Sequence, residues 1–168
     1  MNIAPTEGRE VDVGSRTDVR FLGGDIPVSE IASLDVPGRV THLVHHLGAI
    51  AQVRRFLTDR ESRGNGTSIL SPTFLGYLQS NFIDDPSSSS KVGTGMIAVL
   101  WAVHACRKVD TYGFTAGAPN QKSNHFGHYF DTGRTKHKGD TIHNWEIDHE
   151  LHDRLERARA VTRHHAVR

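Results

Sequence analysis

The chain has 168 residues, of which 36% are hydrophobic, and 20 basic against 19 acidic residues give it a formal net charge of +1. This length suits one domain with a sizeable core, and the balanced charge lacks the basic field that attracts nucleic acid or an anionic membrane. The single cysteine, Cys106, excludes a disulfide within the chain. No apolar run is long enough to span a bilayer, so we expect one domain over residues 1–168 with no membrane segment in it.

The first third of the chain predicts short strands and one helix. Residues 1–17 contain Pro5, Gly8 and Gly14 without a helical period, which predicts a solvated loop. Apolar runs at 18–25 and 39–46 predict strands. Residues 47–57 carry apolar side chains at helical spacing.

The middle of the chain predicts a strand followed by a helix. Residues 67–71 are typical of a strand, and Pro72 is well placed in the first turn of a helix through Phe82. On that helix the spacing of Tyr77 from Phe74 and Leu78 predicts that the tyrosine faces a core.

A glycine turn precedes the most apolar segment. Gly93-Thr94-Gly95 leads into residues 96–105, which are apolar nearly all round, as in a helix packed on a sheet. Such a turn presents backbone N–H groups and the positive end of a helix dipole to an anion such as phosphate, although an ordinary turn is the commoner meaning of this tripeptide. Cys106 ends the helix, and we expect it to be buried.

The last part of the chain predicts one strand and one helix. Residues 109–114 indicate a strand with Gly113 at its carboxyl end, the edge where ligands bind in open α/β sheets. From Ile147 onward, apolar residues at four-residue spacing predict a surface helix that frays by His164-His165.

Histidines concentrate in this region and allow a metal-binding alternative. The candidates are His125, His128, His137, His143, His149 and His152. No His-Glu-x-x-His pattern and no cysteine pair accompany them, which makes this the weaker hypothesis.

The order of these pieces resembles the eukaryotic-type sialyltransferases, glycosyltransferase family 29. Their small motif consists of Pro-Ser-Thr-Gly, an apolar helix, a cysteine and Val-x-x-Tyr-Gly-Phe. This chain is similar to it at Val92-Gly93-Thr94-Gly95, the apolar segment, Cys106 and residues 109–114, in the same order. Their His-Tyr-Tyr-Asp/Glu motif resembles His128-Tyr129-Phe130-Asp131. Their final motif, a histidine with a glutamate five places later, resembles His143 with Asp148.

The start of the chain resembles the second half of the family's large motif. Asn2 to Thr17 matches Asn-x-Ala-Pro-x-x-Gly-x-Glu-x-Asp-Val-Gly-x-x-Thr at nearly every position. The first half of that motif would lie before Met1, so we expect either a fragment of a longer gene product or a fold without its N-terminal strand and a nucleotide-binding loop. The resemblance implies an α/β, Rossmann-like nucleotide-sugar transferase fold, a GT-A variant with a mostly parallel sheet flanked by helices.

The resemblance also implies roles for individual residues. His143 would be the base that deprotonates the acceptor, and His128, beside Tyr129, would stabilise the phosphate. Asn2 would hold the nucleotide, and Thr94, Gly95 and Gly113 would contact it through backbone. Lys91, which with Val92 and Gly93 replaces the family's Tyr-Pro-Ser, would bring positive charge to the phosphate. Asp148 would orient His143 or cap a helix, with one methylene fewer than the family's glutamate.

The implied reaction moves sialic acid from CMP-sialic acid to the glycan of a glycoprotein or glycolipid, with inversion and without a metal or other cofactor. Family members are typically anchored in the Golgi membrane with the catalytic part in the lumen, which is the expected location here. The departures at Gly93 and Asp148 leave open a catalytically inactive relative that only binds glycans or partners.

Overall fold

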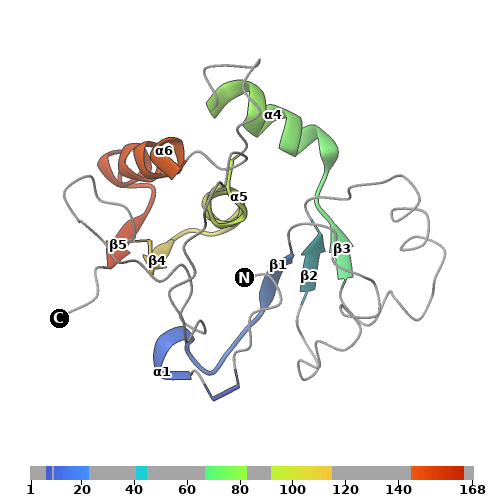
Figure 1. The fold of residues 1–168 in the computed structure, drawn as a ribbon, viewed down its shortest axis with the longest axis vertical. Helices are drawn as coiled ribbons and strands as arrows, with labels where there is room; N and C mark the ends of the chain where they lie inside the picture. Colours follow the sequence, from blue (N-terminus) through green and yellow to red (C-terminus); the bar gives the residue numbers. More distant parts are fainter. Residues whose placement is uncertain are drawn as a thin grey trace, which may run out of the picture. The chain divides into compact units, whose positions relative to one another are not determined.

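The computed structural model describes residues 7–8, 10–22, 41–44, 67–82, 92–114 and 145–164. Figure 1 shows their elements: a short helix and three strands, then two helices, a strand, a helix and a last strand. Contacts divide the chain into two compact units, residues 1–75 and 76–168. Along the chain, helix α4 (Pro72–Phe82) crosses the boundary between the two units.

The first unit contains a parallel three-stranded sheet. Its strands β1 (Val19–Leu22), β2 (Thr41–Val44) and β3 (Thr67–Ile69) lie in that order, with Val19 opposite Thr41 and His42 opposite Thr67. Parallel neighbours cannot be joined by a tight turn and need long crossover connections, as the spacing of these strands in the chain allows. All three strands predicted in this region are confirmed.

A short helix precedes this sheet where the sequence predicted only a loop. Helix α1 (Glu10–Val13) is a single turn, and the Gly14 N–H donates to the Glu10 carbonyl over 2.8 Å. Gly8 and Gly14 have φ of 73° and 77°, the left-handed conformation in which glycine is favoured. The predicted turns are therefore present, and a helical turn lies between them.

Helix α4 (Pro72–Phe82) has the bounds that the sequence predicted. Leu78 is 1% exposed, but Tyr77 is 49% exposed, so the prediction that Tyr77 faces the core is wrong. Consecutive helical residues point about 100° apart, and the tyrosine cannot share the inward direction of Leu78. Its ring meets Phe82 edge-on instead, with centroids 6.3 Å apart.

The second unit is built on a β-α-β arrangement. Strands β4 (Asp110–Tyr112) and β5 (Thr162–His164) pair in parallel, with Thr111 opposite Arg163. Helix α6 (Trp145–Arg157) lies between them in the chain and beside them in space (Figure 1), as a crossover between parallel strands requires. Helix α5 (Thr94–Ala105) precedes β4.

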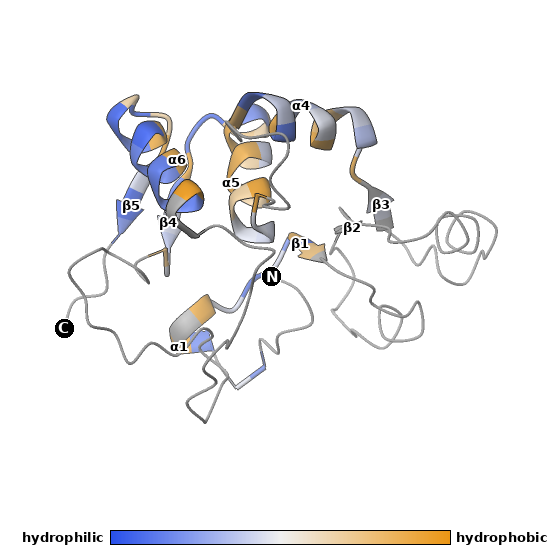
Figure 2. Cartoon of the chain, turned by 45° about the horizontal axis from the view of Figure 1, so that its top comes forward, coloured by the Kyte–Doolittle hydropathy of each residue, from blue (hydrophilic) through white to orange (hydrophobic). Residues whose placement is uncertain are grey.

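Apolar side chains of α5 and α6 supply much of the core of this unit. Figure 2 shows α5 hydrophobic along most of its length, whereas α6 is largely hydrophilic. On α5, one face is buried and the opposite side is partly accessible. The buried apolar residues of the unit are Leu78, Val92, Met96, Ile97, Val99, Leu100, Leu151 and Val161.

The chain does not fray after α6, which corrects the prediction for the C-terminal tail. The helix ends at Arg157, and the N–H groups of Arg159 and Ala160 donate to the carbonyls of Glu156 and Leu155, each over 2.9 Å. These two bonds, with Arg159 at φ 58°, form a Schellman turn. The turn leads into β5, which the sequence did not predict.

Cys106 is exposed, which contradicts the prediction that it is buried. Helix α5 stops at Ala105, and Cys106 has extended backbone at φ −119° and ψ 147°, with its N–H bonded to the Ala102 carbonyl. Because the residue no longer follows the helix, its side chain leaves the buried face.

The fold class is confirmed as α/β with parallel strands. The Rossmann-like GT-A topology and the single domain remain predictions, and the predicted helix at 47–57 lies outside the described residues. In the described segments, no helix has the length and apolar character needed to cross a membrane.

Candidate functional site

The predicted glycine turn forms the start of α5. Gly93 is the N-cap residue, and its carbonyl accepts the N–H of Ile97 over 3.0 Å, the first bond of the helix. Thr94 and Gly95 are the first two helical residues, both half-buried. The N–H groups of a helix's first turn have no partner within the helix, so this is the positive end of α5.

A carboxylate from α6 lies at this positive end. The Gly93 N–H donates to Oδ1 of Asp148 over 3.1 Å, across 55 residues of chain. Asp148 is the fourth residue of α6, so the bond ties the start of α6 to the start of α5. Asp148 therefore accepts an N–H at the N-terminus of α5, and its role in orienting His143 stays a prediction, because His143 lies outside the described residues.

Polar and aromatic side chains cluster along β4 and its partner β5. Gly113 follows the strand with φ 79°, a left-handed conformation. Tyr112, 66% exposed, stacks on His164 of β5 with ring centroids 4.4 Å apart. Asp110 Oδ1 is 2.9 Å from His164 Nε2, and its Oδ2 is 2.9 Å from Lys108 Nζ. The hydrogen bonds from His164 and then Lys108 lower the pKa of the Asp110 carboxyl.

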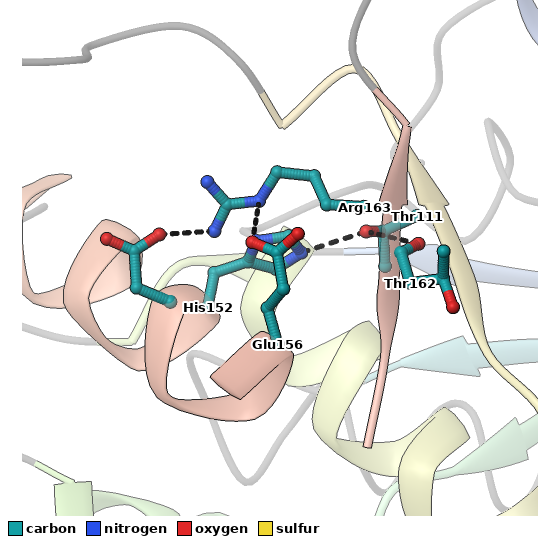
Figure 3. Close-up of polar contacts among 6 residues, drawn as sticks. Thr111, His152, Glu156, Thr162 and Arg163 are labelled. Carbon is teal, nitrogen blue, oxygen red and sulfur yellow. Dashed lines mark hydrogen bonds and ion pairs between the residues drawn. The ribbon is translucent and has the colours of Figure 1, made fainter. Parts of the chain in front are cut away.

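A histidine that the sequence placed only among possible metal ligands is buried between α6 and β4. His152 is 1% exposed, and its Nε2 lies 3.0 Å from the Thr111 hydroxyl (Figure 3). That hydroxyl donates to the Thr162 carbonyl over 3.4 Å. Because the hydroxyl has one proton, it accepts from Nε2–H, and the proton of the neutral imidazole resides on Nε2. The ring also stacks on Phe114 at 5.0 Å.

An arginine of β5 lies against the same histidine. The Arg163 side chain, 11% exposed, pairs with two carboxylates of α6, those of Asp153 at 2.5 Å and Glu156 at 3.4 Å. Figure 3 shows the guanidinium close to the imidazole. Burial, and then the positive charge of Arg163, lower the pKa of His152. The lowered pKa favours the neutral imidazole, and its bond to Thr111 joins α6 to β4.

The structure brings together only some of the predicted site residues. It describes Thr94, Gly95, Gly113 and Asp148, and it joins Asp148 to the turn before Thr94. The others lie outside the described residues, so their roles stay predictions: Asn2, Lys91, His128, Tyr129 and His143.

The metal-binding alternative finds no support in the described segments. There, no group of three or more histidine, cysteine or acidic residues is arranged to hold a metal ion. Of the six candidate histidines, the described segments include His149 and His152, and Nε2 of His152 is bonded to a threonine hydroxyl.

Comparisons with known proteins point to one family. The sequence model of glycosyltransferase family 29 (sialyltransferase) matches residues 31–160. The CMP-N-acetylneuraminate-beta-galactosamide-alpha-2,3-sialyltransferase 2 of Mus musculus is 28% identical over 177 residues, covering 96% of this chain and 47% of the relative. The protein of the same name from Rattus norvegicus is 30% identical over 148 residues, covering 80% of this chain and 39% of the relative.

A third relative gives the same result. The alpha-2,3-sialyltransferase 1 of Gallus gallus is 30% identical over 145 residues, which cover 78% of this chain and 39% of the relative. The chain thus spans less than half the length of these curated relatives. No solved structure matches the chain significantly.

Proposed function

Because the chain belongs to glycosyltransferase family 29, the sialyltransferases, we propose that it transfers sialic acid from CMP-sialic acid to a glycan acceptor. The names of the relatives describe a CMP-N-acetylneuraminate donor and an alpha-2,3 linkage, which supports this donor. The acceptor is the glycan of a glycoprotein or glycolipid. The proposed setting is the Golgi lumen.

The proposed chemistry is a direct displacement with inversion. The acceptor oxygen forms a bond to the anomeric carbon while the bond from that carbon to the CMP phosphate breaks, and its electron pair leaves with CMP. A base must take the acceptor proton, and the departing phosphate's charge must be stabilised. We assign the proton to the imidazole of His143, because imidazole is the side chain that ordinarily titrates near neutral pH. His128, Tyr129 and Lys91 face the phosphate in this proposal.

The described residues contribute backbone contacts to the nucleotide. Thr94 and Gly95 occupy the first two positions of α5, where amides and the helix dipole favour an anion. Gly113 adds a backbone position without a side chain at the carboxyl end of β4. With Asn2, these groups form the proposed nucleotide site. No step needs a metal ion.

The bond between Gly93 and Asp148 is the observation that carries this proposal. It holds the first turn of α6 at the first turn of α5. His143 precedes Trp145, the first residue of α6, by two positions. In this proposal the base is carried by the segment that leads into the tethered end of α6.

The direct test is His143→Ala. We expect this variant to lose transfer, measured as CMP release in the presence of acceptor, and to keep CMP binding, measured by titration calorimetry. His104→Ala is the matched control, because His104 is an exposed histidine near the C-terminal end of α5. Unchanged turnover in His143→Ala would remove this residue from the mechanism.

An inactive, ligand-binding family member is the second candidate. It is favoured by one observation: the N-cap of α5 has no hydroxyl, and its N–H is already bonded to Asp148. This candidate predicts CMP binding with no CMP release at any acceptor concentration. Measurable release that persists in the presence of a chelator favours the transferase instead.

A further inference from the structure

We propose that Gly93 and Asp148 are a matched pair, in which the missing side chain of residue 93 admits the Asp148 carboxylate, and that this pair positions the start of α6 for transfer. The second half of this inference rests on the proposed function, because the group so positioned is His143. The first half concerns the folded chain alone and is tested separately.

The backbone at residue 93 does not require glycine. Its φ of −64° and ψ of 151° are extended values that any residue adopts. At an N-cap, serine, threonine, aspartate and asparagine are preferred, because their side chains accept N–H groups of the first turn. The reason for glycine must therefore lie in what surrounds it.

The Asp148 carboxylate occupies the space that a side chain at residue 93 would need. A Cβ placed on Gly93 would lie 3.3 Å from Cγ of Asp148 and would overlap its Oδ2. The overlapping atom is the end of the Asp148 side chain, so the carboxylate makes room by rotating away from residue 93. That rotation removes the bond from the Gly93 N–H.

Helix α5 lacks the usual local means of capping this N–H. In a capping box, a glutamate or glutamine three residues into the helix accepts the N-cap N–H, but that position of α5 is Met96. Asp148 supplies the acceptor from another helix. Its charge also lies at the positive end of α5, where a carboxylate is stabilised.

The two departures from the family's motifs meet at this contact. Glycine replaces the motif's serine at position 93, and aspartate replaces the glutamate at position 148. A shorter acid reaches the backbone only when the facing residue has no side chain, so each replacement suits the other. We infer that they act as one unit.

A double-mutant cycle tests the pair without any assay of activity. Unfolding by urea is followed for the full 168-residue chain, for Gly93→Ser, for Asp148→Ala and for the double variant. Loss of a charge-assisted hydrogen bond predicts a roughly 10- to 100-fold larger unfolding constant for each single variant. In the Asp148→Ala background, serine at 93 meets no carboxylate and, as a favoured N-cap, should not raise the constant further.

Two further variants control this cycle. Gly76→Ser, in α4, adds a side chain where nothing lies within 4 Å, and we expect no loss. Asp148→Asn keeps an acceptor oxygen at the same distance along the side chain and tests the hydrogen bond without the charge. If the alanine variant does not fold, Asp148→Ser, which also leaves no carboxylate beside residue 93, replaces it as the background. We expect Asn at 148 to lose less than Ala, because the amide oxygen accepts the Gly93 N–H.

The positioning role is read from the kinetics of transfer. Gly93→Ser and Asp148→Ala should lower kcat at least roughly 10-fold and leave the KM for CMP-sialic acid within about twofold, because the base is displaced while the nucleotide contacts remain. Asp148→Asn should recover most of kcat. Equal losses of stability without a change in kcat would limit the pair to a structural role and overturn its positioning role.

The outcomes separate this inference from the proposed function. If the unfolding constant of the double variant changes by the product of the two single changes, the two residues act independently. That result overturns the matched pair, whatever the activity. A non-additive cycle in a chain that binds CMP but never releases it from the donor supports the pair. That same result overturns both the transferase proposal and the positioning role that depends on it.

Discussion

At the residue scale, the buried imidazole of His152 makes stability depend on pH. The pKa of His152 is lowered in the folded chain by burial and by Arg163, whereas an unfolded histidine titrates near ~6.5. Below that pH the unfolded chain binds more protons than the folded one. The free energy of unfolding therefore falls as the pH drops below about 6.5.

We expect this loss of stability between about pH 7.5 and 5.5 to shrink in His152→Gln, as measured by urea unfolding at both values. The control is His104→Gln, which removes an exposed imidazole outside the cluster around His152. The pKa of Asp110 is also lowered in the folded chain. The stability that this carboxylate contributes is therefore lost only when the pH falls below about 3.8, the ordinary pKa of the group. An unchanged pH dependence in His152→Gln would show that another group causes it.

Two residues with positive φ should respond to substitution in opposite directions. Arg159, at φ 58°, occupies the position of the Schellman turn that glycine prefers, so Arg159→Gly should raise the free energy of unfolding by about 1 kcal/mol. Gly113 has φ 79°, and a Cβ at this position would meet nothing within 4 Å, so Gly113→Ala should cost about 1 kcal/mol through backbone strain alone. Thermal unfolding measures both, and changes of the same sign would contradict the argument.

The sequence alone predicted the role of residues that depend only on their near neighbours in the chain. Gly93-Thr94-Gly95 starts a helix and Gly113 ends a strand because turn chemistry depends on near neighbours. The bond between Gly93 and Asp148 could not be predicted in this way, since 55 residues separate its partners. His152 was missed as a structural residue for the same reason: its partner Thr111 is 41 residues away.

At the element scale, α5 is apolar on all sides, yet its residues are not equally important. Leu100 is 2% exposed and Val103 is only half-buried. Leu100→Ala should lower the free energy of unfolding by about 3 kcal/mol, through lost burial and a cavity, and Val103→Ala by about 1 kcal/mol. Chemical denaturation compares the two, and equal losses would show that both faces of α5 are packed alike.

Elements with a clear pattern were predictable, and one without a pattern was not. The bounds of α4 follow from Pro72 and the apolar spacing, and β1 and β2 from compact apolar runs. Strand β5, with the sequence Thr-Arg-His, has no alternation of apolar residues. It is a strand because it pairs with β4 and because Arg163 binds acids of α6, contacts that only the folded chain provides.

At the scale of the whole molecule, a nucleotide that binds only the folded chain must stabilise it. At a CMP concentration about 100 times the dissociation constant, the free energy of unfolding should rise by about 2.7 kcal/mol. Thermal shift with CMP measures this, and the shift should survive addition of a chelator, since the proposed site needs no metal. No shift with CMP or CMP-sialic acid at millimolar concentration would contradict the proposed nucleotide site.

The pairing of β4 with β5 has a consequence during synthesis. Asp110 of β4 pairs with Thr162 of β5, so the ribosome makes about fifty further residues before the partner strand exists. At roughly 5–20 residues per second, the first strand waits about 3 to 10 seconds with an open edge. An edge of this kind is a template for association with other chains.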